Sequence, residues 1–216
     1  MEENTMFMYE SKIDNVKVAV GTVVEAPRFF EKDGVKRAEV KIKDWRNEVL
    51  SIFFNNKADG APAKQLADRI EKVHLKEGSY IACLCLKAPD QKSATGIGFQ
   101  FSGIFTDLVE YKEDGTESIV TVIVGLGCNP KKVKDGMYSI SIPVKNKDGA
   151  TDWYSISFYD NEKAKNAETA EKLFKGDKRT CAVRCGAIKT KEVDGRVFNN
   201  LTGYRIEVAP SAPKEA

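Results

Sequence analysis

Five cysteines are the residues of this 216-residue chain with the most distinctive chemistry: Cys83, Cys85, Cys128, Cys181 and Cys185. Cys83 and Cys85 lie two residues apart in an alternating stretch, so both point to one face of a strand, and Cys181 and Cys185 have the same parity. Four thiolates could hold zinc, but neither pair has the usual spacing of a zinc-binding loop, and the pairs fall in different halves of the chain. We therefore predict buried, reduced thiols and no metal site.

The sequence has few residues suited to acid–base or nucleophilic catalysis. The single histidine, His74, precedes Leu75 at the expected end of a helix and is predicted to lie on the surface. One histidine leaves little for a Ser-His-Asp or Cys-His arrangement, and the acidic residues form no obvious metal cluster. Gly125-Leu126-Gly127 lacks the strand–loop–helix context of a phosphate-binding loop. We predict no catalytic residues, no cofactor and no enzymatic activity; a nuclease or enzyme accessory is the least favoured alternative.

The elements that carry these residues occur twice, about a hundred residues apart. Val18-Ala19-Val20-Gly21 corresponds to Val122-Ile123-Val124-Gly125, and further pairs follow in the same order: Glu48–Phe54 with Asp152–Phe158, Leu75–Ser79 with Leu173–Asp177, and Cys83 with Cys181. The order and spacing indicate a duplicated domain rather than a solenoid, whose periods are ~20–50 residues.

Each copy has the period-two alternation of strands and one segment with helical spacing. In the first copy we expect strands at Val16–Val24, Ala38–Lys43, Val49–Phe54, Tyr80–Leu86 and Phe99–Phe105, and a helix at Ala61–Leu75. In the second we expect strands at Thr121–Gly127, Met137–Val144, Trp153–Tyr159, Lys178–Ile188 and Leu201–Val208, and a helix at Glu162–Phe174. Three strands, a helix and two strands are the order of an OB-fold, a five-stranded Greek-key barrel. We therefore predict an all-β chain of two tandem OB-folds; a β-sandwich is the alternative, but the single helix at one fixed place argues against it.

Composition indicates an ordinary globular protein, with 42% hydrophobic and 31% charged residues. The length suits two domains of about a hundred residues, which we place at residues 1–115 and 116–210, followed by a disordered tail at 211–216. No stretch approaches the ~20 apolar residues of a membrane span, and the acidic start Met1-Glu2-Glu3-Asn4 does not resemble a secretion signal. We expect a cytoplasmic protein without a membrane partner.

The second copy resembles the single-stranded-DNA-binding proteins of bacteria and phages, the SSB family. The resemblance covers most of residues 120–208, whereas the first copy matches more loosely. Its matching pieces are, in order, Val122–Pro130, Ser139–Val144, Asp152–Tyr159, an Ala-rich helix, Leu173–Asp177 and a strand that ends near Lys189-Thr190. The resemblance implies sequence-nonspecific binding and protection of single-stranded DNA in replication and recombination. The alternative is a tandem OB-fold scaffold for protein partners that binds little or no nucleic acid.

The resemblance places the stacking aromatics of the family on Trp153 and Tyr159. Stacking on a base contributes ~1–3 kcal/mol with little sequence preference. Both residues share their side of the strand with two serines, whereas Ile156 and Phe158 point to the other side, so we expect Trp153 and Tyr159 on the wet face. The alternative is that Trp153 fills the core or a strand edge, and Tyr154 is expected in the core.

The first copy departs from this pattern, because Val49 and Asn55 occupy its two aromatic positions. We therefore expect weaker stacking there. Trp45, in the hairpin before the third strand, could compensate by reaching over the groove, or could pack on a neighbouring domain. A further aromatic of the family falls near Val193 in the second copy, where Phe198 is the nearby substitute.

Basic residues gather in the segments where an OB-fold holds its ligand. The net charge is +2, but residues 1–116 carry 17 Lys and Arg against 19 Asp and Glu, whereas residues 117–216 carry 17 against 13. We predict phosphate contacts from three groups of the second copy: Lys131, Lys132 and Lys134, then Lys145 and Lys147, then Lys189, Lys191 and Arg196. In the first copy the candidates are Arg28, Lys43 and Arg46, whose acidic neighbours should weaken their attraction to phosphate.

The resemblance also implies an assembly of four OB domains, which a two-domain chain reaches as a homodimer. The predicted strand Val16–Val24 would leave an unpaired edge that another strand or chain must cover, and a twofold dimer interface covers it symmetrically. In a monomer the two domains would instead cover each other's edges. The sequence ends Ala209-Pro210-Ser211-Ala212-Pro213-Lys214-Glu215-Ala216 without the acidic tail through which the family recruits replication and repair enzymes. Recruitment of such partners is therefore not predicted.

Overall fold

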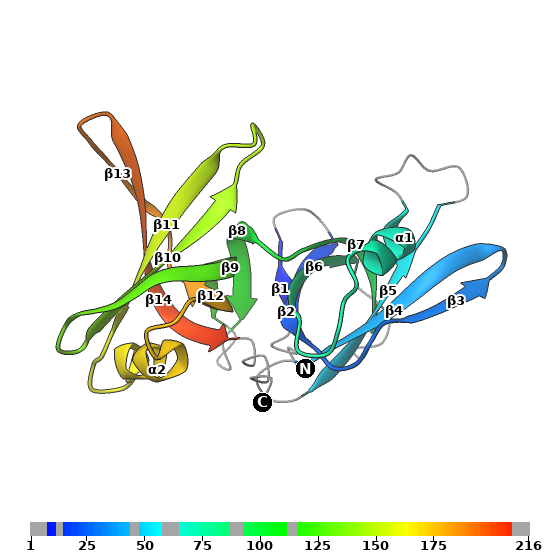
Figure 1. The fold of residues 1–216 in the computed structure, drawn as a ribbon, viewed down its shortest axis with the longest axis horizontal. Coiled ribbons are helices and arrows are strands. Elements are labelled where there is room, and N and C mark those ends of the chain that lie inside the picture. The colour runs from blue at the N-terminus through cyan, green and yellow to red at the C-terminus, as the bar shows by residue number, and fades with distance from the viewer. Residues whose placement is uncertain are drawn as a thin grey trace. The chain divides into compact units, whose positions relative to one another are not determined.

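The computed structural model describes residues 8–11, 15–43, 48–57, 65–86, 93–111 and 116–208. These residues form fourteen strands and two helices, which confirms the prediction of a mostly β chain. The chain divides into two compact units, residues 1–100 and 101–216 (Figure 1). The predicted boundary at residues 115 and 116 lies inside the second unit, because a strand at Gly103–Tyr111 pairs there.

The first unit contains seven strands and one helix among its described residues: β1 (Met8–Glu10), β2 (Val16–Val23), β3 (Arg28–Lys32), β4 (Val35–Lys43), β5 (Val49–Asn55), α1 (Leu66–Lys72), β6 (Tyr80–Leu86) and β7 (Ser93–Gln100). The pairings run β2–β4–β5–β7–β6 and return to β2, with β5 and β7 parallel and the other pairs antiparallel. β3 pairs with β4, and β1 pairs with β2.

The second unit repeats this order with β8 (Gly103–Tyr111), β9 (Glu117–Lys134), β10 (Met137–Lys145), β11 (Thr151–Tyr159), α2 (Asn166–Phe174), β12 (Arg179–Cys185), β13 (Lys189–Val193) and β14 (Arg196–Val208). The pairings run β9–β10–β11–β14–β12 and return to β9, and β11 and β14 are the parallel pair. β8 pairs with β9, and β13 extends β14 as a hairpin (Figure 1).

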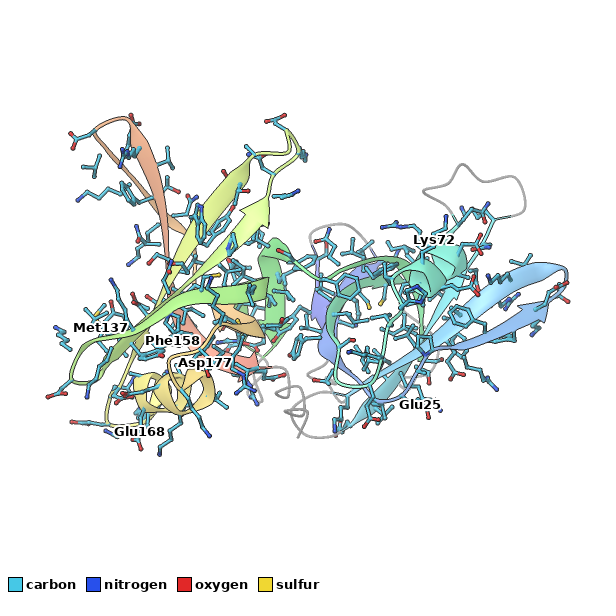
Figure 2. All side chains as sticks on the ribbon, viewed as in Figure 1. Glu25, Lys72, Met137, Phe158, Glu168 and Asp177 are labelled. Carbon is cyan, nitrogen blue, oxygen red and sulfur yellow. The ribbon has the colours of Figure 1, made fainter. Side chains whose placement is uncertain are left out.

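The core of each unit lies on the inward side of these strands. In the first unit Leu50, Ile52 and Phe54 alternate inward along β5 and are fully buried with Ile70 of α1. In the second unit Ile156 and Phe158 of β11 pack in one cluster with Ile140, Ile142 and Phe174 (Phe158 is labelled in Figure 2). This alternation leaves the outward side of each strand available for other chemistry.

A glycine on the parallel neighbour strand accommodates the large core ring in each unit. A Cβ atom added to Gly96 would overlap the ring of Phe54, and one added to Gly203 would overlap the ring of Phe158. The two rings therefore occupy equivalent places, as the predicted repeat requires. The cysteine pairing is shifted, however, because Gly125 pairs with Cys181 whereas Gly21 pairs with Ile81. Cys181 thus corresponds to Ile81 and not to Cys83.

The contact between Phe54 and Gly96 makes a prediction about stability. We expect Gly96→Ala to lower the free energy of unfolding by about 1–3 kcal/mol, the usual cost of overpacking a core. Gly98→Ala is the matched control in the same strand, because its methyl group would meet Leu84 at 3.7 Å, an ordinary contact distance. Urea unfolding followed by circular dichroism compares the two variants. Equal stability of the two would contradict the close packing of the ring on Gly96.

Each helix begins under a cap supplied by the residue that follows the preceding strand. Asn56 Oδ1 accepts hydrogen bonds from the backbone N–H groups of Ala67 (3.0 Å) and Asp68 (3.3 Å). Asp160 Oδ1 accepts the equivalent bonds from Ala167 (2.9 Å) and Glu168 (3.3 Å). These bonds satisfy donors that a helix start leaves without a partner.

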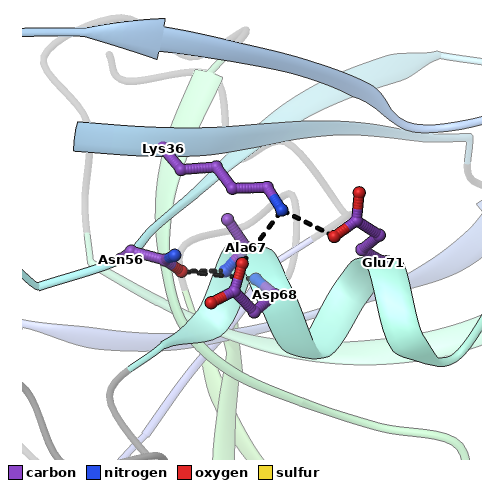
Figure 3. A network of polar contacts seen from close by, with 5 residues as sticks. All are labelled: Lys36, Asn56, Ala67, Asp68 and Glu71. Carbon is purple, nitrogen blue, oxygen red and sulfur yellow. Dashed lines mark hydrogen bonds and ion pairs between the residues drawn. The ribbon is translucent and has the colours of Figure 1, made fainter. Parts of the chain in front are cut away.

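In the first unit a lysine fastens the helix to the sheet (Figure 3). Lys36 Nζ of β4 lies 2.9 Å from Asp68 Oδ1 and 2.6 Å from Glu71 Oε2. The two carboxylates raise the pKa of Lys36, and the hydrogen bond from Lys36 lowers the pKa of Asp68. Lys36 therefore stabilises the packing of α1 on β4.

The structure changes several predicted boundaries. The predicted strand Phe99–Phe105 is wrong, because β7 ends at Gln100 and β8 begins at Gly103. The last strand of the first ring is β7, whose glycines obscure its alternation. The helices are shorter than predicted, and residues 61–64 of the first prediction lie outside the described residues.

The strand Val16–Val24 is not an open edge, which corrects the physical argument for a dimer. β2 pairs with β6 from Val16–Leu86 to Thr22–Tyr80, and its other side pairs with β1 and β4. A partner chain is not needed to cover it.

All five cysteines are buried and none forms a disulfide, as predicted. Burial raises the pKa of Cys85 and of Cys181 to about 12, so both are neutral thiols at physiological pH. Within the described ranges no group of three or more His, Cys, Asp or Glu side chains is placed to hold a metal ion. No helix in the described part of the chain has the length and apolar character to cross a membrane.

Candidate nucleic-acid-binding face

The outward side of β11 carries the two aromatics predicted from the sequence. Trp153 is 51% exposed and Tyr159 is 43% exposed. The alternative in which Trp153 fills the core is therefore wrong. Tyr154, one residue along, is partly buried against the core, as predicted.

Two neighbouring strands extend this outward side into a sheet face, which we call the β11 face. β10 places Pro143 opposite Trp153 and Met137 opposite Tyr159. On the other flank β14 runs parallel to β11. The same pairings align four serines with two residues of β14: Ser139, Ser141, Ser155, Ser157, Asn200 and Thr202.

Phe198 lies toward the same end of this face as Trp153. It precedes Asn200 by two residues and so points to the same side of β14. The parallel pairing of β11 and β14 begins at Tyr154 and Asn199, so Trp153 and Phe198 each lie one residue before its first pair. Phe198 is 47% exposed. Two exposed rings from adjacent strands thus form one end of the face.

Cations surround the face on several elements. Lys191 lies opposite Phe198 and Lys189 opposite Asn200. Lys131 lies opposite Ser139 of β10, and Lys134 lies opposite Met137 beside Tyr159. The remaining predicted cations occupy hairpin ends, where all are exposed: Lys145, Lys147 and Arg196. These seven side chains make no ion pair with any carboxylate of the described residues. They are therefore available to phosphate.

Lys132 is the predicted cation that the structure does not bring to the face. It lies opposite the buried Tyr138, and its Nζ is 2.9 Å from Asp135 Oδ1. This carboxylate raises the pKa of Lys132. An irregularity in the β9–β10 register breaks the simple alternation there. Simple alternation would place Lys132 and Lys134 on the same side, so sequence parity alone could not have separated these two lysines.

The sequence prediction missed an exposed aromatic of β14. Tyr204 of β14 is exposed, and the guanidinium carbon of Arg184 lies 5.6 Å from its ring centroid. Arg184 is also held by the carboxylate of Glu110 in β8, with its Nε 2.9 Å from Oε1. The alternation of Tyr204 with the buried Leu201 and Gly203 was a usable signal for an outward-facing ring.

The corresponding face of the first unit is neutralised by its own charges. Arg28 Nη2 lies 2.8 Å from Glu39 Oε2, and Arg28 Nε donates to the same oxygen at 3.0 Å. Ser51 Oγ donates to Glu39 Oε1 at 3.0 Å. The Glu39 side chain is 10% exposed, so this carboxylate is held inside the face. Arg28, predicted to contact phosphate, is engaged by Glu39.

Aromatic rings of the first unit pack on one another at this place. The centroids of Phe30 and Phe53 are 6.5 Å apart in an edge-to-face arrangement, and Arg28 lies 5.2 Å above Phe30. Val49 and Asn55 occupy the places of Trp153 and Tyr159, and Val49 is 45% exposed. Lys43, opposite Val49, is exposed. The predicted residues Trp45 and Arg46 lie outside the described residues.

Comparisons with known proteins give a similarity at the level of solved structures only. No protein-family model matches the sequence, and no curated protein matches it significantly. The chain is similar to a deletion mutant of the single-stranded DNA binding protein from Thermus aquaticus, with 13% identity, a TM-score of 0.30, and coverage of 93% of this chain and 97% of that one. It is also similar to a Replication Protein A heterotrimer bound to ssDNA, with 10% identity, a TM-score of 0.30, and coverage of 95% and 51%. Both scores are too low to support an argument about this chain.

Proposed function

We propose that each unit is an OB-fold barrel and that the second unit binds single-stranded DNA. The ring of five pairings in each unit, with one helix between the third and fourth ring strands, supports the fold. The observation that carries the function is the β11 face. It presents the exposed rings of Trp153 and Phe198 at one end, among cations that lack carboxylate partners in the described residues.

This arrangement suits binding without strong sequence preference. Every base has a flat face that can stack on Trp153, Phe198 or Tyr159, and the cations contact phosphates whatever the base. Stacking and charge need no cofactor, so we propose a binding protein and not an enzyme. Its role would be to protect exposed strands during replication and recombination in the cytoplasm of a bacterial or phage system.

Titration of the protein with an oligo-dT of thirty nucleotides at low salt, followed by tryptophan fluorescence, tests this function. Stacking of a base on Trp153 is expected to quench its emission. Absence of binding under these conditions, in a protein with native circular dichroism, would remove the proposal.

We further propose that the chain forms a homodimer with four OB domains. This rests on the resemblance to the SSB family, since β2 is already paired. Light scattering at micromolar concentration is expected to give a mass near twice 24.0 kDa. A mass near that of one chain would refute the dimer and leave DNA binding intact.

A second function is favoured for the first unit. Glu39 neutralises Arg28 there, and Val49 and Ile97 are exposed apolar side chains on outward positions. Such a surface suits a protein partner better than a polyanion. A loss of DNA affinity that arises only from substitutions on the β11 face would agree with this division. An equal loss of DNA affinity from a substitution of Lys43 would oppose it.

A further inference from the structure

A strip of small polar side chains separates the two aromatic positions of the β11 face. Ser155 lies between Ser141 of β10 and Asn200 of β14, and Ser157 lies between Ser139 and Thr202. We call these six residues the serine floor. Trp153 borders it at one end and Tyr159 at the other, six residues apart along β11, which corresponds to about 20 Å at ~3.3 Å per residue.

The hydroxyl groups of the serine floor have no side-chain hydrogen-bond partner among the described residues. Ser139 is 8% exposed, and Ser141, Ser155 and Ser157 are half-buried. Asn200 makes only a long bond, from its Nδ2 to the carbonyl oxygen of Phe198 at 3.4 Å. None of these hydroxyl oxygens is among the buried polar atoms without a partner, so they reach solvent and are open to a ligand.

The first unit lacks such a floor at the equivalent place. Phe53 stands where the second unit has Ser157, and its ring packs on Phe30. Ser51, the equivalent of Ser155, is present but donates its hydrogen bond to Glu39. The open hydroxyls are therefore a property of the β11 face and do not follow from the fold.

We infer that the serine floor receives the edges of bases in a single strand that runs along β11 between the two aromatic positions. This inference rests on the proposed function and specifies which part of the ligand touches the sheet. A hydroxyl both donates and accepts a hydrogen bond and rotates to suit its partner, so it serves any of the four bases. Small side chains leave depth for a base, whereas the cations at the rim hold the phosphates away from the floor. The span is consistent with the lower end of the ~4–16 nucleotides that one OB-fold covers.

Valine and threonine have nearly the same shape, and both favour strands, so they separate the hydroxyl from the space it fills. The experiment compares Ser155→Val/Ser157→Val with Ser155→Thr/Ser157→Thr. Each variant is titrated with a labelled oligo-dT of ten residues and with an abasic strand of the same length and charge. We expect the valine variant to bind oligo-dT about tenfold more weakly than the threonine variant, the loss expected for two hydrogen bonds. The two variants should bind the abasic strand equally.

Each other result has a distinct meaning. Equal affinities of the two variants for oligo-dT would overturn the serine floor as a base-binding surface. An equal loss on the abasic strand would also overturn it, because the hydroxyls would then contact the backbone. Failure of the unaltered protein to bind oligo-dT would refute the proposed function itself. Circular dichroism verifies folding, and the single changes Ser157→Val and Ser157→Thr replace the double changes if the latter do not fold.

Discussion

A tenfold rise in salt concentration is expected to weaken binding of oligo-dT by at least about a thousandfold. Each phosphate contact to a single strand contributes about −0.7 to the slope of log affinity against log salt, because bound counterions are released. The seven cations around the β11 face make no ion pair with a described carboxylate. Four of them in contact with phosphates suffice for a slope of about −3. The fluorescence titration repeated at several salt concentrations measures this slope.

Lys131 and Lys132 provide a matched pair for the same measurement. Lys131 is on the β11 face, whereas Lys132 is paired with Asp135 on the other side of β9. Lys131→Gln is expected to reduce the slope by about 0.7, and Lys132→Gln is expected to leave it unchanged. A slope near zero in the unaltered protein would contradict phosphate contacts, and equal effects of the two changes would contradict the assignment of Lys132.

Trp153→Ala is expected to weaken binding by about 5- to 150-fold, which corresponds to the ~1–3 kcal/mol of one stacked base. Trp153→Phe should recover part of the loss, since a smaller ring still stacks. Val49→Ala is the control at the equivalent place of the first unit. Val49 is exposed, so this change should alter neither affinity nor stability appreciably.

Anisotropy of a labelled oligonucleotide is the suitable measurement here, because the substitution removes a fluorescent tryptophan. Equal losses from Trp153→Ala and Val49→Ala would show that the two units bind alike. No loss from Trp153→Ala, with the salt slope intact, would mean that the phosphates alone hold the strand.

The order of strands and helices was accessible from the sequence because both depend on local periodicity. The alternation in β11 also gave the correct side for Trp153 and Tyr159. The strands β3 and β13 were missed although each is joined to its partner by an Asp-Gly turn. Asp33 and Gly34, like Asp194 and Gly195, have positive φ angles, as the two-residue hairpins require. Those dipeptides were a usable hairpin signal.

The pairing of charges was not accessible in the same way. Arg28 and Glu39 face each other because the Asp33-Gly34 hairpin fixes the register of β3 on β4. Lys134 reaches the β11 face because of an irregularity in the β9–β10 pairing, since simple alternation would place it on the same side as Lys132. Both outcomes depend on registers between strands, which residue counts along one strand do not determine.

The alternation that buries Phe54 and Phe158 has a consequence for how a duplicated gene can diverge. Alternate positions of β5 and β11 are under different constraints, because one set of side chains must fit the core and the other set faces solvent. Substitution of an outward-facing residue, such as Phe53 in one copy and Ser157 in the other, therefore changes the stability of the fold little. One copy can therefore keep its binding surface while the outward positions of the other change to fit a different partner, and the core of both copies stays the same.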